Sequence, residues 1–289
     1  MPQHGSRSAA VRSTPPLRQL HSLNCCPPAV CATCPCATDP PPAAPAGSRR
    51  LTLGQALLQR NDQQAAALRR RFHQAGLPVL NLISSPGSGK TALLERLGAE
   101  MGQRNLRLAV IVGDLATDRD ARRLAAAGVE AVPISTCQAC HLEAAMVARA
   151  LERLPLPLER LDLLVIENVG NLVCPAAFDL GESLRVVLLS VCEGEDKPLK
   201  YPASFHSSDL VLLGKSDLAG VVGFDRAQAL AHLEAVAPGA AVREVSARSG
   251  AGLEALLEWL LHPREPRGEW EWRGWGVAGQ RGTAKGAEG

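Results

Sequence analysis

Short apolar runs alternate with amphipathic stretches through the middle of this chain. Runs such as Leu161–Ile166 and Val186–Val191 are nearly continuous, which is typical of parallel strands covered on both faces. The pattern predicts strands at 78–83, 107–112, 131–134, 161–166, 185–191, 209–213 and 241–245. It predicts helices from Leu51 onward and near 91–103, 118–127, 139–153, 225–236 and 250–261,. Strands that alternate with helices in this way indicate a three-layer α/β domain.

The two ends of the chain lack this periodicity. Residues 1–50 are rich in Pro, Ala, Ser and Cys and are predicted to form a flexible arm, with a linker at 40–47,. Residues 263–289 are rich in Gly and are predicted to be a disordered tail. The Trp residues of the tail either dock on a partner or belong to an unselected extension. The folded domain is therefore predicted to span residues 51–262.

Composition narrows the possible functions. Hydrophobic residues make up 46% of the 289 positions and aromatic residues only 3%, so the core is expected to consist of Leu, Val and Ala. The net charge of +2 and the absence of like-charge blocks argue against nucleic acid as a partner,. No apolar run approaches the roughly 18 residues that span a bilayer. We expect a cytoplasmic protein without a membrane partner.

The start of the chain has two interpretations. Its first 38 residues contain no Asp or Glu and carry Arg7, Arg12 and Arg18. This composition resembles an organelle transit peptide, although it lacks the apolar core of a secretory signal. A wrongly assigned start codon explains it equally well. With no secretory signal, the nine cysteines favour metal or redox chemistry over structural disulfides,.

A glycine-rich turn follows the first predicted strand and has the form of a phosphate-binding loop. The strict pattern begins with glycine where this chain has Ser84, but it ends in the expected Gly-Lys-Thr,. Backbone N–H groups of such a loop face the phosphates, Lys90 reaches the outer ones, and the Thr91 hydroxyl can bind Mg²⁺. The predicted nucleotide contacts are Pro86, Gly87, Ser88, Gly89, Lys90 and Thr91. We therefore predict a P-loop NTPase domain with a mostly parallel sheet.

Two further strand ends carry residues suited to hydrolysis. Asp114 follows the second strand, where its carboxylate suits Mg²⁺ or a water molecule, although Asp114 and Thr117 also suit helix capping,. Glu167 follows the apolar strand Leu161–Ile166 and is predicted to order the Mg²⁺ shell. Gly170 then allows a backbone N–H to approach a γ-phosphate. The predicted catalytic residues are thus Asp114, Glu167 and Gly170. For Asp120 the sequence does not decide between a functional and a structural role.

The base-binding residues are predicted from two later strand ends. Gly214-Lys215-Ser216-Asp217 resembles the guanine-reading Asn-Lys-x-Asp motif of GTPases, with glycine in place of asparagine. The Asp217 carboxylate can accept hydrogen bonds from both N1–H and the 2-amino group of guanine, which adenine cannot match. Ser246 and Ala247 resemble the motif that backs the base. GTP is therefore the predicted nucleotide.

Cysteines and one histidine form two groups of candidate metal ligands. Cys31, Cys34 and Cys36 place three thiols within six residues of the arm, a spacing that suits Ni²⁺, Zn²⁺ or Cu(I),. Free thiols in a disordered arm are the alternative. Cys140 and His141, with Cys174 and with Cys137 as a further candidate, form the second group. Cys192 is predicted to be a buried strand-end residue.

The stretch from Cys137 to His141 also matches the attachment pattern for c-type haem,. We reject haem, because attachment takes place in exported proteins and this stretch is predicted to open a helix of a nucleotide domain. The loop from Gly170 to Cys174 separates a predicted nucleotide sensor from a predicted metal ligand by four residues. Nucleotide and metal are therefore expected to influence each other.

Together these residues resemble the HypB family, GTPases that insert nickel into [NiFe]-hydrogenase. The resemblance covers roughly residues 51–261, and the run Glu167–Pro175 is nearly diagnostic. The matching stretches are 81–91, 113–120, 140–142, 166–177, 178–181 and 193–202.

The resemblance implies a GTP-dependent homodimer with Cys140, His141 and Cys174 at the subunit interface. It also implies nickel handover with a zinc-containing HypA-like chaperone and delivery to the hydrogenase large-subunit precursor. The implied cofactors are GTP, Mg²⁺, Ni²⁺ and Zn²⁺. Some members carry an N-terminal nickel site of the form Cys-x-x-Cys-Gly-Cys, and the arm resembles it with Pro35 for glycine. Thirty residues precede the motif here, so the fourth ligand is open between the terminal amine, Cys25 and Cys26.

Intrinsic GTP hydrolysis is expected to be slow, because no arginine finger is recognisable in the sequence. The sequence leaves two alternatives open. A nickel or zinc storage protein with a vestigial GTPase would bind metal regardless of nucleotide. A urease-type nickel GTPase would generally use a Cys-Pro-His site and lack the thiol-rich arm.

Overall fold

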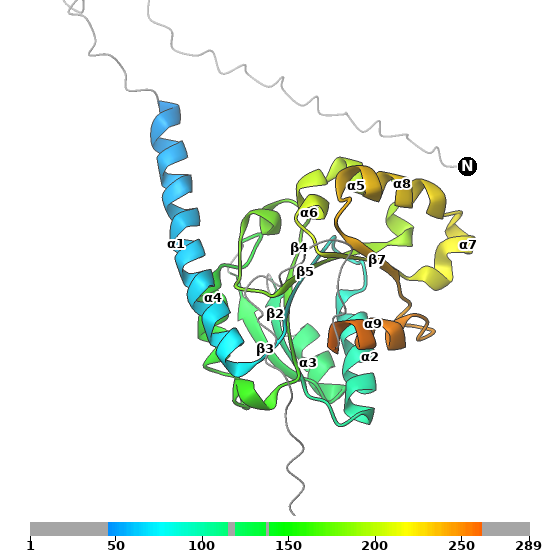
Figure 1. Ribbon diagram of the computed structural model, residues 1–289, viewed down its shortest axis with the longest axis horizontal. Coiled ribbons are helices and arrows are strands. Elements are labelled where there is room, and N and C mark those ends of the chain that lie inside the picture. Colours follow the sequence, from blue (N-terminus) through cyan, green and yellow to red (C-terminus); the bar gives the residue numbers. More distant parts are fainter. Residues whose placement is uncertain (1–45, 115–118, 137–138, 262–289) are drawn as a thin grey trace, which may run out of the picture. The chain divides into compact units, whose positions relative to one another are not determined.

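The fold is a seven-stranded parallel sheet with helices on both faces (Figure 1). The computed structural model describes residues 46–114, 119–136 and 139–261. The strand order is β3-β2-β4-β1-β5-β6-β7. The strands are β1 Val79–Ser84, β2 Leu108–Asp114, β3 Glu130–Ser135, β4 Leu163–Gly170, β5 Leu184–Ser190, β6 Leu210–Gly214 and β7 Ala241–Glu244. The predicted strands and the three-layer α/β class are confirmed.

Helices connect the strands, and most of the long ones match the sequence pattern. The short helices α5 to α7 and the 3-10 turns were not predicted. The helices are α1 Ala46–Ala75, α2 Lys90–Gln103, α3 Arg119–Ala126, α4 Ala144–Leu151, α5 Lys197–Lys200, α6 Pro202–His206, α7 Ala219–Val222, α8 Arg226–Val236 and α9 Leu253–Leu261. The 3-10 turns are η1 Leu158–Arg160, η2 Cys174–Ala177, η3 Val191–Glu193 and η4 Ser216–Leu218.

Alternating side chains of each strand supply the two faces of the sheet. Leu80 and Leu82 of β1 pack with α2, α3 and α9 on one face. Val79 of the same strand packs on the opposite face with α1 and α4. On that opposite face, Ile83 joins β5 and β6 under α6 and α8. Figure 1 shows α1 beside α4 and, across the sheet, α2 beside α9. The apolar runs of the strands are thus explained by burial on both sides.

Three local predictions are wrong. The helix expected over 139–153 begins only at Ala144, so Cys140 and His141 lie in the loop before α4. Cys192 was predicted to be buried but is exposed, because β5 ends at Ser190 and the chain turns into η3. The Ser190 side chain accepts a hydrogen bond from the Cys192 backbone N–H and caps that turn. Helix α1 also begins at Ala46, earlier than the Leu51 that the periodicity suggested.

The parallel arrangement brings the carboxyl ends of the strands to one edge of the sheet. Central strand β1 lies between β4 and β5, and β2 lies on the far side of β4. Ligands of open α/β sheets bind at this edge. Among the described residues, no helix is long and apolar enough to cross a membrane.

Candidate functional site

The phosphate-binding loop lies between β1 and α2, as the sequence predicts. Gly87 and Gly89 have φ of 73° and 103°, a region of backbone conformation that only glycine adopts without strain. Lys90 begins α2, so the loop leads directly into a helix N-terminus. This geometry presents backbone N–H groups to an anion.

Ser84 explains the departure from the strict loop pattern. Its buried hydroxyl accepts hydrogen bonds from Lys90 Nζ at 2.8 Å and from Ser88 Oγ at 2.6 Å, and donates to the Ser85 carbonyl at 2.8 Å. The serine therefore ties the start of the loop to its lysine. The sequence alone gave no sign of this role.

The predicted Mg²⁺ residues come from the start of α2 and from the neighbouring strands β4 and β2. Thr91 Oγ1 donates to Glu167 Oε1 at 3.2 Å, and both residues are buried. Asp114 ends β2, the strand next to β4. The side chain of Asp114 and all of Thr117 lie outside the described part of the chain. Thr91 and Glu167 fit a Mg²⁺ ion, because hydroxyl and carboxylate oxygens are its preferred donors.

Gly170, the last residue of β4, lies directly against the phosphate-binding loop. A Cβ at this position would stand 3.1 Å from Pro86 Cα and 3.2 Å from Pro86 N. Both neighbours are backbone atoms, which cannot move aside as a flexible side chain can. A Cβ at position 170 would therefore press on the backbone of the phosphate-binding loop, so glycine suits this close approach whether or not its N–H contacts a phosphate.

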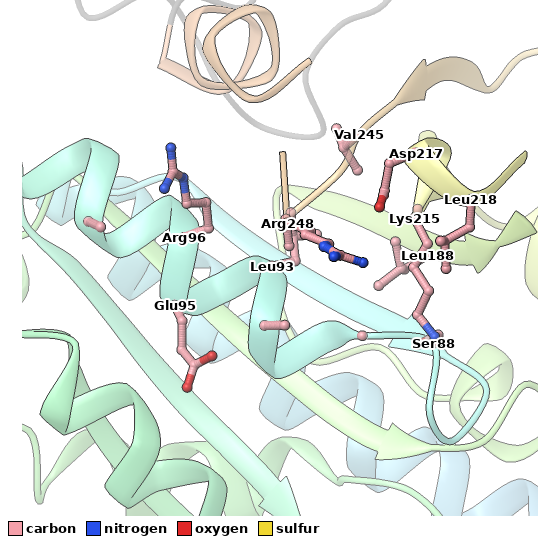
Figure 2. Close-up of a pocket in the computed structure, with 15 residues that line it drawn as sticks. Ser88, Leu93, Glu95, Arg96, Leu188, Lys215, Asp217, Leu218, Val245 and Arg248 are labelled. Carbon is pink, nitrogen blue, oxygen red and sulfur yellow. The ribbon is translucent and has the colours of Figure 1, made fainter. Parts of the chain in front are cut away.

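Of the predicted base-binding residues, Lys215, Asp217 and Ala247 line one cavity of about 490 Å³, and Ser246 is buried. Asp217 accepts a hydrogen bond from Ser246 Oγ at 2.6 Å, which fixes the orientation of its carboxylate. Lys215 Nζ donates to the Gly87 carbonyl at 2.8 Å and so connects the base region to the phosphate loop. Ala247 and Arg248 complete this side. Figure 2 shows Asp217, Lys215 and Leu218 on one side of the cavity, with Arg248 extending toward them.

Leu188 accounts for glycine at position 214. A Cβ on Gly214 would stand 2.7 Å from Leu188 Cδ1, which is closer than carbon atoms pack. Leu188 also lines the cavity. An apolar side chain of β5 thus occupies the space that any side chain at position 214 would need.

Cys140, His141 and Cys174 form a compact group of metal donors. Their donor atoms lie within 4.8 Å of one another. The Cys140 and Cys174 sulfurs are 2.8 Å apart, and the Cys140 sulfur is 3.7 Å from His141 Nδ1. Two sulfurs and one imidazole suit Ni²⁺ or Zn²⁺ and leave a position open. Cys137 and the arm cysteines Cys31, Cys34 and Cys36 lie outside the described residues.

The surroundings of His141 favour a neutral ring in a fixed position. Burial lowers the pKa of His141, and the Glu143 carboxylate opposes this only in part. The ring stacks on Phe178 with a centroid distance of 3.8 Å and an interplanar angle of 21°. A neutral imidazole is the form that binds metal. The hydrogen bond to Cys174, followed by desolvation, raises the pKa of the Cys140 thiol.

Strand β4 joins the nucleotide site to these donors. Asn168, next to Glu167, accepts a hydrogen bond from the Leu142 backbone N–H at 3.3 Å. Asn171 donates to the Cys140 carbonyl at 3.1 Å. The same segment reaches Cys174, where η2 begins. Both halves of the metal site are therefore attached to the end of one strand.

Comparison with known proteins now settles the family. The sequence profile of the family described as "CobW/HypB/UreG, nucleotide-binding domain" matches residues 78–244. A hydrogenase maturation factor HypB from Azotobacter vinelandii is 54% identical over 220 residues, covering 76% of this chain and 72% of that protein. The chain belongs to the HypB family.

Other HypB proteins are similar in sequence and structure. The hydrogenase/urease maturation factor HypB of Helicobacter pylori (strain ATCC 700392 / 26695) is 43% identical over 210 residues, or 72% of this chain and 86% of that protein. A crystal structure of HypB from Helicobacter pylori in complex with nickel has a TM-score of 0.67 at 42% identity, covering 73% of this chain and 100% of that one. HypB from Archaeoglobus fulgidus gives a TM-score of 0.64 at 36% identity, with coverage of 70% and 98%. The P-loop GTPase fold is therefore shared along the described domain.

Proposed function

We propose that this chain is a GTP-hydrolysing nickel metallochaperone that delivers nickel during [NiFe]-hydrogenase maturation. The observation that carries the proposal is the position of β4. Its Glu167 accepts a hydrogen bond from Thr91 of the phosphate loop, and its continuation carries Cys174 to 2.8 Å from Cys140. A change at one site therefore has a short covalent path to the other.

In the proposed reaction the chain holds GTP and orients the attacking water. Backbone N–H groups of 87–91 and the Lys90 ammonium hold the phosphates, and Asp217 and Lys215 hold the base. Thr91, Glu167 and Asp114 would hold Mg²⁺, which neutralises phosphate charge when bound. Asp114 orients the water, and the Gly170 N–H faces the γ-phosphate. We expect slow turnover, since no arginine finger is recognisable.

Nickel is the cargo in this scheme. Cys140, His141 and Cys174 bind it through two thiolates and a neutral imidazole, donors that Zn²⁺ also accepts. Loss of the γ-phosphate contact at Gly170 is proposed to move the 171–174 segment and so alter the spacing of the ligands. Movement of a loop by a nucleotide is a common switch in GTPases. Cys31, Cys34 and Cys36 are proposed as a second, nucleotide-independent site.

The proposed partners follow from family membership. The chain is expected to act as a GTP-dependent homodimer with the metal site at its interface. It would exchange nickel with a HypA-like zinc-containing chaperone and pass it to the hydrogenase large-subunit precursor in the cytoplasm. Neither nucleic acid nor a membrane is part of this proposal.

Complementation tests the proposal in a bacterium that lacks its own HypB. The chain should restore [NiFe]-hydrogenase activity at limiting nickel, and Lys90→Ala and Cys174→Ser should not. Cys192→Ser is the matched control, because this cysteine is exposed and lies outside the metal site. Full activity of Lys90→Ala would reject the GTPase switch and favour nickel buffering. Failure of the unaltered chain, when it is expressed and folded, would reject hydrogenase maturation.

A further inference from the structure

Asn61 of α1 joins two loops that are distant in the sequence. Its Nδ2 donates to the Asp179 carbonyl at 2.8 Å, and its Oδ1 accepts from the Ala144 backbone N–H at 2.9 Å. The residue is only 4% exposed, so water does not readily replace either bond. One amide side chain therefore satisfies a donor in one loop and an acceptor in the other.

Both of these loops carry the candidate metal donors. Ala144 is the first residue of α4, directly after the loop that holds Cys140 and His141. Asp179 follows Phe178, whose ring stacks on His141 at 3.8 Å. Asn61 thus connects the Cys140–His141 loop to the segment that begins at Cys174, without touching a donor atom itself.

Helix α1 is well anchored for this role. Arg69 donates to both carboxylate oxygens of Asp179 at 2.7 and 2.8 Å. Two turns of apolar side chains, including Leu68 and Phe72, pack in one cluster with Leu142. The helix therefore binds both the side chain of Asp179, through Arg69, and the backbone carbonyl of Asp179, through Asn61.

The Asp179 loop packs closely against α1. A Cβ on Gly181 would stand 2.7 Å from the Ala65 carbonyl oxygen and 2.8 Å from Leu68 Cβ. Such contact leaves the loop no room to shift toward the helix. Gly181 also has φ of 80°, so the turn depends on glycine in two ways.

We propose that Asn61 is a positioning residue of the metal site. It holds Cys140 and His141 at a set distance from Cys174, and in this way determines nickel affinity and coordination geometry. The inference rests on the metal site of the proposed function and adds to it a residue of α1, which lies outside the family match at 78–244. Groups that hold ligands in place commonly change metal affinity 10–100-fold when removed.

The test uses Asn61→Leu, which removes both hydrogen bonds, and Asn61→Asp, which keeps only an acceptor for Ala144. Leu68→Ala is the control, since it loosens α1 packing and leaves the bridge intact. All are made in the full chain with Cys31→Ser, Cys34→Ser and Cys36→Ser, so that the arm does not bind nickel. Nickel affinity and the sulfur-to-nickel charge-transfer absorption are measured, with GDP affinity as a check on folding.

We expect Asn61→Leu to weaken nickel binding about 10–100-fold and to shift the charge-transfer band, with GDP affinity unchanged. Asn61→Asp should fall between it and the parent, and Leu68→Ala should keep the parent spectrum. Parent-like nickel affinity and spectrum in Asn61→Leu would overturn the inference. Equal spectral shifts in Leu68→Ala and Asn61→Leu would also overturn it. Failure of the parent to bind nickel overturns the proposed metal site itself, which is a separate result.

Discussion

Replacing Asn168 tests whether the buried amides behind the metal loop act as a unit. Asn168 Oδ1 accepts from the Leu142 and Val169 backbone N–H groups at 3.3 and 3.0 Å, and Nδ2 donates to Asn81 Oδ1 at 3.2 Å. Asn81 Nδ2 in turn donates to Glu182 Oε1 at 3.2 Å. The Glu182 carboxylate is paired with Arg185 and only accepts hydrogen bonds. Asn81 must therefore donate to Glu182, and Asn168 must donate to Asn81.

The structure sets the expected magnitude. Asn81 and Asn168 are both 0% exposed, so a lost partner is not replaced by water. Asn168→Ala removes the side-chain acceptor of the Leu142 and Val169 N–H groups and the donor to Asn81 Oδ1. Each unsatisfied buried group costs about 1–3 kcal/mol, so the loss of three partners is expected to lower the unfolding free energy by about 3 kcal/mol or more. Asn168→Asp keeps the two bonds accepted from Leu142 and Val169 but places a carboxylate oxygen against Asn81 Oδ1. Rotation of the Asn81 amide would relieve this repulsion only by breaking its hydrogen bond to Glu182.

Urea unfolding of the metal-free, GDP-bound protein measures this loss, and Asn171→Ala is the control. Asn171 donates to Cys140 from a more exposed position, so its removal should cost less than about 1 kcal/mol. A double variant with Asn81→Ala should cost less than the sum of the single changes, because the two residues share one bond. A loss below about 0.5 kcal/mol for Asn168→Ala would refute the reasoning.

Three further predictions follow from contacts in the structure. Gly170→Ala should weaken GTP binding more than GDP binding, measured by displacement of a fluorescent nucleotide, and an equal effect on both would contradict a γ-phosphate role. Gly214→Asn should lower Tm because its Cβ meets Leu188, and the same change should lower Tm less in a Leu188→Ala background, which is itself destabilised because Leu188 is buried,; no change in Tm for Gly214→Asn would show that the space is free. Arg69→Met should destabilise the protein by about 1 kcal/mol at neutral pH. Burial raises the pKa of Asp179, but Arg69 and the Gly181 N–H bring it below its ordinary value. The contribution is therefore present above the unfolded-state pKa and lost as pH falls through the folded one, so a difference in urea midpoint that persists at low pH would contradict it.

Much of the fold could be predicted because the strands are buried on both faces. Runs such as Val186–Val191 have one interpretation when helices follow them at regular intervals. Helix α4 was placed too early because the residues 139–143 have the composition of a helix but are held in a loop. Asn61 accepts from Ala144, the first residue of the helix, and Asn168 accepts from Leu142 just before it. These contacts join residues that are distant in the sequence, so the local pattern of apolar residues cannot predict them.

The site was predictable where the chemistry lies within a short motif. Two such motifs are the loop at Gly87–Thr91 and the group Cys140, His141 and Cys174. Their combinations of residue types are rarely found outside phosphate-binding and metal-binding sites. The supporting residues were missed, because Asn61 looks like any polar position of an amphipathic helix. Asn81 gave a usable sign, since an amide inside an apolar strand must find a buried partner.

Nickel titration in two nucleotide states tests the central claim most directly. The full-length protein is titrated with Ni²⁺ at matched Mg²⁺, once with GDP and once with a non-hydrolysable GTP analogue, and again as Cys174→Ser. The account predicts one site whose affinity or stoichiometry changes with nucleotide and disappears in Cys174→Ser, beside a second site that stays constant. Superimposable curves in the two nucleotide states would contradict coupling through β4 and support nickel buffering instead.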